Sequence, residues 1–583
     1  MDRRLRFALV LAASVQALLV VAMLYRASYD GYIHMFFADH YRRDWWALQE
    51  MRWYTGFSVA SYPPLVHQLI ALVSIPFGVE SAWAIVLWSI LTALPSGVYA
   101  FARIFVRPGA AGYAAIASAV LPSVFLSAHT FGQLPTLTGL LAILWGLAVL
   151  HTYLRGGRPI DGLLASLLMS VAASAHHGAL LFMPFGVTAV VLHAAFVDRL
   201  ARRPLVRRVA LFSAVSLAAL ACVIWPFWRW GMAQTMQTPI DHPSRHNFLA
   251  DLNAQGLFFW AVYGPLVVVI PFAVRLMVQR KRFVLGALFV LMFTLGLGGT
   301  TALPRLLYGP GWAWLTYDRF SLWATITLLP LAGVLVVIAR FKLRRKGRRA
   351  WLIARAAMLL PMGAAALVSA LLASVLPLQP RPIDMQPIVS FLAEGDRAQW
   401  RYLTFGFGDQ LARLSLLTEA TTIDGSYHTA RELPELRSSG IGQIDTAYWL
   451  PGGLDALDPI IDQAGARGVR WGFVNLDVYA AVLERHGWRR LAALPNGVVV
   501  WENPAAVRPS TGHLVDRTDP VAAASWGVLP LSALGAVAGL AYLRKRPIAA
   551  RRQALLWPGG LANRRASRPP ASATETASVR RIS

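Results

Sequence analysis

Residues 7–25 read FALVLAASVQALLVVAMLY, a run without a charged side chain, and Arg3, Arg4 and Arg6 stand just before it. A helix rises about 1.5 Å per residue and the hydrocarbon core of a bilayer is about 30 Å thick, so the run predicts a membrane-spanning helix. No small-residue cleavage site closes the run. We therefore expect a retained helix and not a removed signal peptide.

Eleven further apolar runs of comparable length predict further crossings. They lie near residues 82–105, 111–128, 134–154, 160–176, 178–198, 207–226, 257–276, 283–303, 319–339, 351–377 and 521–543. Of the 583 residues 56% are hydrophobic and 14% are charged, which is more apolar surface than a soluble chain of this length buries. The sequence therefore predicts a polytopic α-helical membrane protein with about twelve crossings.

One more apolar stretch, residues 62–78, is predicted not to cross. It begins with Pro63 and Pro64 and contains His67, features that favour a re-entrant or interfacial segment. A crossing here would reverse the side of every later loop.

The formal net charge of +26 resides largely in short basic runs between the apolar stretches. This placement is typical of a membrane orientation signal, and we expect no nucleic-acid partner. With the N-terminus in the cytoplasm, the basic runs share one side: Arg103 with Arg107, Arg155 with Arg158, 199–208, 280–282 and 340–349. We expect a multi-pass protein of the plasma (inner) membrane with both termini cytoplasmic. The single cysteine, Cys222, excludes an intramolecular disulfide.

The predicted domains follow from changes in composition. Residues 1–378 form a multi-helix membrane domain with a long first external loop, 26–61, and residues 521–543 form the last transmembrane helix. Residues 379–520 alternate predicted helices (386–394, 477–486) with predicted strands (402–405, 469–474, 498–501), which indicates an α/β domain. This domain lies between an outward and an inward crossing and is predicted to be extracytoplasmic. Residues 544–583 form a basic, disordered cytoplasmic tail.

The first external loop combines many aromatic residues with acids and histidines, so we expect an amphipathic helix along the membrane surface. Asp30, directly after the first helix, has two interpretations. It caps the following helix, or it shares a helix face with His34 and acts as a general base or a ligand of a divalent cation.

Other polar residues are candidates for lining a cavity on the outer side: His34, Asp39, His67, His176 and His177. Adjacent residues on a helix point about 100° apart, so we expect at least one of His176 and His177 to have a packing role. In the outer domain, residues 424–432 form a polar cluster that either lines a path to the cavity or is a satisfied loop network.

The motifs 29–34 (YDGYIH) and 61–67 (SYPPLVH), in and after a long first external loop, resemble the GT-C class of membrane glycosyltransferases. That class includes oligosaccharyltransferases, protein mannosyltransferases and aminoarabinose transferases. The resemblance extends through 132–135 (GQLP), 176–178 (HHG) and 318–320 (DRF). Within the class, the chain is most similar to bacterial membrane proteins labelled as 6-pyruvoyl-tetrahydropterin synthase-related.

The resemblance implies hexosyl or pentosyl transfer, with inversion, from a polyprenyl-phosphate-linked sugar in the bilayer to an extracytoplasmic acceptor in cell-envelope glycan, lipid or protein glycosylation. By position, Asp30 is the acidic residue that serves as base or metal ligand in that class. Arg319 and Arg305 are the candidates for the donor phosphate, which suits the planar guanidinium; the alternatives for Arg319 are a surface pair with Asp318 or snorkelling. A divalent cation, Mg or Mn, would be held by Asp30 and His34. No second acidic motif and no WWD-type acceptor signature is evident.

The alternative to a transferase is a non-catalytic transporter or flippase, or a polysaccharide-assembly scaffold. A transporter is expected to have internal repeats with broken helices in matching halves, and acids within its spans. The sequence has no such pairing and no such acids, which favours the transferase. It predicts neither the sugar nor the oligomeric state.

Overall fold

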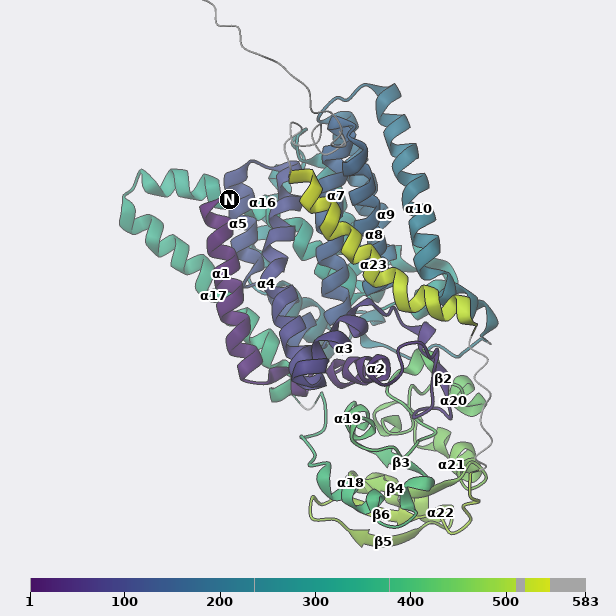
Figure 1. The fold of residues 1–583 in the computed structure, drawn as a ribbon. Helices are drawn as coiled ribbons and strands as arrows, with labels where there is room; N and C mark the ends of the chain where they lie inside the picture. Colours follow the sequence, from purple (N-terminus) through teal and green to yellow (C-terminus); the bar gives the residue numbers. More distant parts are fainter. Residues whose placement is uncertain (1, 235, 377, 510–518, 546–583) are drawn as a thin grey trace, which may run out of the picture.

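The computed structural model describes residues 2–234, 236–376, 378–509 and 519–545. A bundle of helices makes up most of it, and a smaller α/β domain lies at one end of the bundle (Figure 1). Eight helices are long and apolar enough to cross a membrane: α1 (Arg3–Val21), α4 (Val79–Phe105), α7 (Leu134–Gly156), α9 (Ala179–Phe196), α10 (Arg202–Ala233), α16 (Asp318–Arg344), α17 (Arg348–Val375) and α23 (Pro520–Lys545).

Two further candidate spans are bent helix pairs. The first joins α5 (Pro108–Ser118) to α6 (Pro122–Phe125) and the π-helix η3 (Leu126–Thr130) at 42°, and the second joins α11 (Leu252–Gln255), η5 (Gly256–Trp260) and α12 (Ala261–Tyr263) to α13 (Leu266–Met277) at 63°. With the shorter α8 (Pro159–Ala175) and α14 (Phe283–Gly296), these helices account for all twelve predicted runs. Length and composition support eight spans, or ten with the bent pairs, so twelve crossings remain a prediction.

The stretch 62–78 contains α3 (Leu65–Phe77). Thirteen residues reach only about 20 Å, which is less than the hydrocarbon core. At Gly78 the backbone has φ = 75°, a left-handed value that ends α3 and lets α4 begin at the next residue. A full crossing by α3 is therefore not expected, and its depth in a membrane remains a prediction.

The first external loop departs from the expected surface helix. Its helix α2 (Gly31–Arg43) is buried continuously from Gly31 to Tyr41, because α3 packs on one side of it and α19 (Gln410–Leu417) of the α/β domain on another. The prediction of an amphipathic helix along the membrane surface was therefore wrong. The aromatic rings belong to a protein core instead; Phe36, for example, stacks on Trp53 with ring centroids 3.8 Å apart.

The α/β domain has a four-stranded sheet in the order β3-β4-β6-β5. The strands are β3 (Arg401–Phe405), β4 (Val469–Val474), β5 (Arg489–Ala493) and β6 (Val499–Glu502); β3 and β4 are parallel and the other pairs antiparallel. Its α-helices are α18 (Gln386–Ala393), α19, α20 (Pro434–Ser439), α21 (Asp458–Ala464) and α22 (Ala480–Arg485). The three predicted strands are present. The unpredicted β5 is an edge strand whose residues are all exposed, so it lacks the alternation that marks a strand in a sequence.

The first external loop and the α/β domain pack as one unit. The loop carries the two-stranded β1 (Gln49–Glu50) and β2 (Phe57–Ser58). Several hydrogen bonds join it to the domain, and three of them follow one another along the loop. Thr422 donates its N–H to the Arg52 carbonyl (2.9 Å), the Trp53 indole donates to Ser415 Oγ (2.9 Å), and the Tyr54 hydroxyl donates to the Gly425 carbonyl (2.6 Å). Residues of the loop thus complete the core of the domain.

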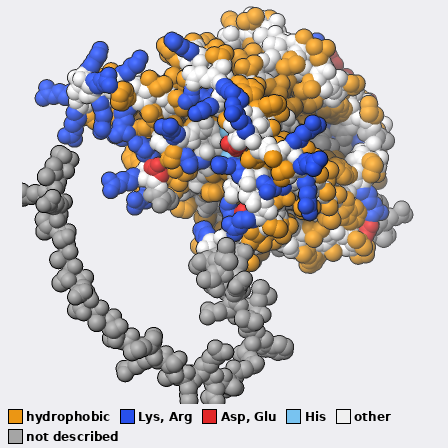
Figure 2. Space-filling model, turned by 90° about the horizontal axis from the view of Figure 1, so that it is seen from above, with side chains coloured by type: hydrophobic (Ala, Val, Ile, Leu, Met, Phe, Trp, Pro, Cys, Tyr) orange, Lys and Arg blue, Asp and Glu red, His pale blue; other side chains and the backbone are white. Residues whose placement is uncertain are grey.

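The opposite end of the bundle is basic. The N-terminal ends of α1 and α10 and the turn between α16 and α17 lie on the side away from the α/β domain (Figure 1). Figure 2 shows that side, with Lys and Arg spread over it and few acids among them. These basic segments thus lie at one end of the bundle, in agreement with the common side predicted from the sequence. Their cytoplasmic orientation remains a prediction. Of the predicted tail 544–583, residues 544 and 545 end α23 and the rest lies outside the described residues.

We predict that Arg52→Met lowers the stability of the loop and domain unit far more than Arg42→Met. Both arginines bond the buried Asp39 carboxylate (2.8 and 2.9 Å), but the Arg52 side chain is 6% exposed and that of Arg42 is 49% exposed. Removing Arg52 leaves buried charge on Asp39 and Glu50, which costs about 3–5 kcal/mol, whereas an exposed pair contributes about 0–1 kcal/mol. Thermal unfolding and limited proteolysis in detergent measure the difference. Equal melting of the two variants would contradict this account.

Candidate functional site

Asp30 lies in a turn between the 3-10 helix η1 (Leu24–Ala27) and α2. The N–H groups of Tyr29 and Asp30 donate to the carbonyls of Thr130 and Phe131, each at 3.0 Å, which fixes the turn to the end of η3. Asp30 occupies the N-cap position of α2, but its carboxylate accepts no capping hydrogen bond. The capping interpretation therefore fails for the side chain, which among the described residues has no hydrogen bond or ion pair.

Two glycines allow this turn to pack closely. Gly132 has φ = +70°, and a Cβ there would lie 2.7 Å from the Gly31 nitrogen and 3.0 Å from the Asp30 nitrogen. At Gly31 itself, a Cβ would lie 2.5 Å from Ser28 Oγ. The glycine of the motif 132–135 therefore has a structural role, because it permits direct backbone packing against Asp30.

Arg319 lies in the first turn of α16 and is half-buried. One of its terminal nitrogens, Nη1, donates to Thr316 Oγ1 at 2.7 Å, while Nε is buried without a hydrogen-bond partner. Its neighbour Asp318 instead accepts a hydrogen bond from Gln133 Nε2 at 3.1 Å. The alternative of a surface pair between Asp318 and Arg319 is thus not found. In the part of the chain that the structure describes, no carboxylate lies within ion-pair distance of Arg319.

The surroundings of Asp30 act on its pKa in opposite directions, and the result lies near neutral pH. Burial raises the pKa of the Asp30 carboxyl to about 7, the Arg319 guanidinium acts to lower it, and Asp318 acts to raise it further. Asp30, Arg319 and Asp318 are therefore close enough for their charges to interact. A carboxyl with a pKa near 7 can take up a proton and release it under physiological conditions.

Two tyrosines form an aromatic wall beside this pair. Tyr62 and Tyr427 meet edge to face with ring centroids 5.2 Å apart, and the Tyr427 hydroxyl donates to the Ser61 carbonyl at 3.1 Å. Burial raises the pKa of both phenols, and the charges of Asp30 and Arg319 act on both. Tyr427 belongs to the 424–432 cluster, so the α/β domain contributes directly to the surroundings of Asp30.

The histidines divide into two groups. His34 Nδ1 and His67 Nε2 share a hydrogen bond of 3.0 Å, and the His34 ring also stacks on Trp83. His176 adjoins this group through Tyr62, with ring centroids 6.0 Å apart. The His177 ring instead packs on Phe227 of α10, at 3.9 Å. His176 and His177 thus have different surroundings, but α8 ends at Ala175, so their separation does not arise from the spacing of adjacent helical residues.

Two other candidates lie apart from Asp30. The Asp39 carboxylate is 2% exposed and is bound by three arginines, Arg42, Arg43 and Arg52, so it stabilises the loop and does not line a cavity. Arg305 lies on α15 (Leu303–Tyr308), is exposed, and stacks over the Trp312 ring at 5.1 Å. Of the two arginines proposed for phosphate, Arg319 is therefore the one whose charge acts on Asp30.

Asp409, at the start of α19, was not predicted as a site residue from the sequence. It accepts a hydrogen bond from Gln379 Nε2 at 2.7 Å, and burial raises its pKa well above the usual range, with Asp30 raising it further. The α/β domain thus brings a second carboxyl toward Asp30. The local sequence of Asp409 has no motif, so only the docking of the domain reveals it.

The predicted metal pair, Asp30 with His34, stays a prediction. His34 Nδ1 is engaged by His67, whereas His34 Nε2 is buried without a hydrogen-bond partner among the described residues. The charges that act on Asp30 are those of the Arg319 guanidinium and the Asp318 carboxylate. Mg²⁺ and Mn²⁺ prefer oxygen ligands. Within the described ranges, one group of three potential ligand residues has its atoms within 4.8 Å of one another: His151, His193 and Asp198, at the opposite end of α7 and α9.

No protein-family model matches the chain, and no curated protein matches it by sequence. Several solved structures are similar to it. The match to the arabinofuranosyltransferase AftD from Mycobacteria has a TM-score of 0.50 and 15% identity, and it covers 88% of this chain and 42% of that chain. The match to the oligosaccharyltransferase of Archaeoglobus fulgidus has a TM-score of 0.49 and 12% identity and covers 84% of this chain and 73% of that chain, and the match to ArnT from Cupriavidus metallidurans bound to undecaprenyl phosphate has a TM-score of 0.47 and 13% identity and covers 85% and 98%, respectively.

The similarity to solved structures concerns the fold. The described chain is mostly helical, with eight candidate membrane spans and a fold similar to that of the arabinofuranosyltransferase AftD, which agrees with the GT-C-like fold that the resemblance predicted. The narrower resemblance to proteins labelled as 6-pyruvoyl-tetrahydropterin synthase-related remains a prediction.

We predict that Gly132→Ala destabilises the protein while Gly156→Ala does not. A Cβ at residue 132 would press on the backbone of the Asp30 turn at a positive φ, whereas one at residue 156 would meet nothing within 4 Å. Overpacking costs about 1–3 kcal/mol, and replacing a helical glycine by alanine stabilises by about 0.4–1 kcal/mol. Thermal unfolding of both purified variants checks this. A melting point for Gly132→Ala at or above that of Gly156→Ala would refute the packing role.

Proposed function

We propose that the protein is an integral membrane glycosyltransferase that moves a sugar from a polyprenyl-phosphate donor to an acceptor on the side of the α/β domain. The observation that carries the proposal is that, among the described residues, neither the Asp30 carboxylate nor the Arg319 guanidinium has an ion pair, while the charge of Arg319 acts on Asp30. The Asp30 carboxylate is suited to accept a proton from an acceptor hydroxyl, and the Arg319 guanidinium is suited to bind a phosphate. Membrane glycosyltransferases with the same fold, including one bound to undecaprenyl phosphate, support the assignment.

In the proposed reaction Asp30 is the general base. The acceptor hydroxyl loses its proton to the Asp30 carboxylate as its oxygen forms a bond to the anomeric carbon of the donor sugar. The bond between that carbon and the phosphate oxygen breaks, and its electron pair leaves with the polyprenyl phosphate. Arg319 stabilises the negative charge that develops on the leaving group, where a fixed cation lowers the barrier. Attack opposite the leaving group inverts the anomeric centre.

The α/β domain is proposed to shape the acceptor side of the site. Tyr427 comes from this domain and lies against Tyr62, and Asp409 comes from the same domain. Aromatic rings beside a polar group are suited to contact a sugar or its acceptor through an apolar face while leaving hydroxyls free for hydrogen bonds. In the proposed orientation the site faces the extracytoplasmic side of the plasma (inner) membrane, and the basic end faces the cytoplasm.

We predict that Asp30→Asn abolishes most of the transfer while Asp44→Asn does not. Asp44 lies in the same loop but is exposed, and its carboxylate bonds the backbone of residues 46 and 47. Losing a general base lowers a rate by roughly 10²–10⁴-fold. Purified protein is incubated with short-chain polyprenyl-phosphate sugars, and release of the carrier is followed.

Equal turnover of wild type and Asp30→Asn would remove Asp30 from the mechanism. No release by wild type with any donor would instead favour the transporter, flippase or scaffold alternative.

The pH dependence of transfer provides a separate prediction. Because Asp30 must be ionised to act as a base and its pKa is about 7, kcat/KM should rise with pH up to about 7 and be constant above it. Arg319 lowers the pKa of Asp30, so Arg319→Gln should move the rising limb to higher pH besides weakening donor binding. Arg305→Gln is the control and should leave the limb in place. If the rising limb of the profile does not shift in Arg319→Gln, the limb does not reflect the ionisation of Asp30.

A further inference from the structure

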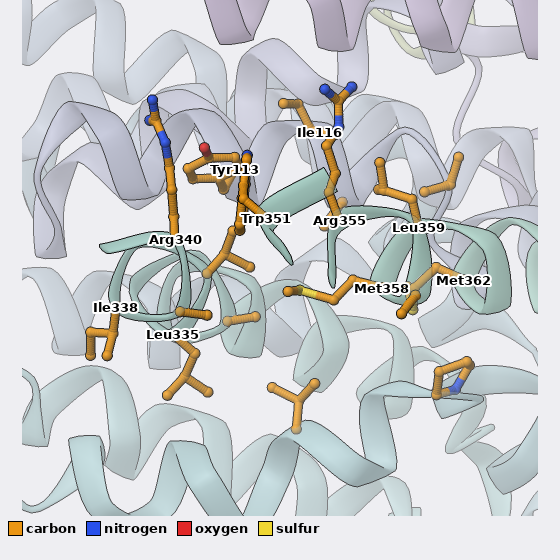
Figure 3. Close-up of a pocket in the computed structure, with 18 of the residues that line it drawn as sticks. Tyr113, Ile116, Leu335, Ile338, Arg340, Trp351, Arg355, Met358, Leu359 and Met362 are labelled. Atoms are coloured by element: carbon orange, nitrogen blue, oxygen red, sulfur yellow. The ribbon is translucent and has the colours of Figure 1, made fainter. Parts of the chain in front are cut away.

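A second potential site lies far from Asp30, at the basic end of the bundle. A cavity of about 1080 Å³ opens there between α1, α5, α13, α16 and α17. Its walls are mainly apolar, as Leu335, Ile338 and Met358 illustrate (Figure 3). The volume is slightly above the range of about 300–1,000 Å³ for small-molecule sites. An apolar cavity of this size needs an apolar occupant in a membrane.

The same cavity is lined by six cations and no acid. The cations are Arg3, Arg4, Arg340, Lys342, Arg344 and Arg355. None of them has an ion pair with a carboxylate in the ranges that the structure describes. Their charge is therefore available to an anionic ligand, and it adjoins an apolar wall.

Aromatic contacts hold some of these cations at the cavity. The Arg4 guanidinium carbon lies 5.0 Å from the centre of the Tyr113 ring, and that of Arg355 lies 5.7 Å from the centre of the Phe7 ring. Both rings line the cavity as well. Figure 3 shows Arg340 and Arg355 extending to the same side, away from Leu335, Ile338 and Met358. Ile116, Tyr113 and Trp351 lie on the side to which the guanidinium groups extend. The cavity thus has a cationic rim and an apolar interior.

We propose that this cavity binds an anionic phospholipid from the membrane leaflet on the side away from the α/β domain. The lipid phosphate lies among the arginines and an acyl chain lies along the apolar wall. Each basic residue near a membrane surface attracts an anionic headgroup, and the buried chain adds a hydrophobic contribution. An acidic peptide would match the rim but not the apolar interior, so the charge and the apolarity together indicate a lipid.

The polyprenyl-phosphate donor is a poorer match for this cavity. Arg3 and Arg4 begin α1 and Asp30 follows its end, and a helix of 19 residues is about 28 Å long. A phosphate at the cationic rim is therefore on the opposite side of the bundle from Asp30. The proposal does not depend on the proposed transferase activity, because it concerns a separate site.

The bound lipid would fill a gap between helices that have few protein neighbours. In both α1 and α17, 28% of the most apolar window is buried within the protein, compared with 72% in α16. A lipid between them adds to the contact that Arg355 of α17 makes with Phe7 of α1. An anionic phospholipid is therefore expected to stabilise the full-length protein.

The test uses the full-length protein in detergent, with phosphatidylglycerol and phosphatidylcholine of identical acyl chains as probes. Native mass spectrometry measures the bound lipid, and thermal unfolding measures stabilisation. We expect wild type to bind phosphatidylglycerol in preference to phosphatidylcholine. The double variant Arg340→Gln/Arg355→Gln should bind phosphatidylglycerol about tenfold more weakly.

Arg202→Gln/Arg203→Gln is the matched control, because it removes the same charge from exposed residues of α10 at the same end of the bundle. It should leave binding unchanged. If the first double variant does not fold, Ala357→Phe fills the cavity, keeps all six cations, and should also lose the lipid. Equal binding of both lipids by wild type, or equal loss in the control, would overturn the proposal. Displacement of phosphatidylglycerol by an equimolar polyprenyl phosphate would overturn it as well.

Discussion

Asp30 and Arg319 form no ion pair among the described residues, although the Arg319 charge acts to lower the pKa of the Asp30 carboxyl. The Asp30 backbone is fixed by the carbonyls of Thr130 and Phe131, and Arg319 Nη1 is engaged by Thr316. A closed ion pair in a low-dielectric setting would satisfy both charges, whereas here neither group is satisfied by the other. Gly132 lets the backbone pack against the Asp30 turn, and the Gln133 amide donates a hydrogen bond to Asp318. In the proposed reaction, the carboxylate is thus available as a base and the guanidinium is available to a phosphate.

The first external loop joins the two parts of the molecule. Its helix α2 contacts α3 on the membrane side and α19 on the side of the α/β domain, and its Trp53 and Tyr54 side chains bond residues of the domain. Asp30 begins this helix. Any displacement of the domain would therefore reach Asp30 through packed protein. This explains how Tyr427 and Asp409, from a distant part of the chain, belong to the same electrostatic environment.

The sequence predicted those features that depend on local composition. Apolar runs of sufficient length identified the helices. Asp30 and Arg319 were each candidates from their positions in the sequence, whereas the effect of one charge on the other comes from the structure, and their roles stay a prediction. What could not be predicted depends on distant contacts. The sequence of α2 is compatible both with a helix buried on two sides and with an amphipathic surface helix, because aromatic residues are common in protein cores and at membrane interfaces.

Three further features were hidden for related reasons. Asp39 has the residue type of a site carboxylate, but its three arginine partners become visible only in the fold. Asp409 lacks a motif because its role depends on the docking of its domain. The exposed β5 has no alternating pattern because neither of its faces is buried.

The packing of the first loop against residues 415–425 also bears on how the protein is made. The loop leaves the ribosome about 350 residues before the segment that covers it. At about 5–20 residues per second, this corresponds to an interval on the order of 20–70 s. During that time Phe36, Trp53 and Tyr54 have no α/β domain to pack against, although the helix before them is already synthesised. The packing between the first loop and the α/β domain can therefore form only late in synthesis.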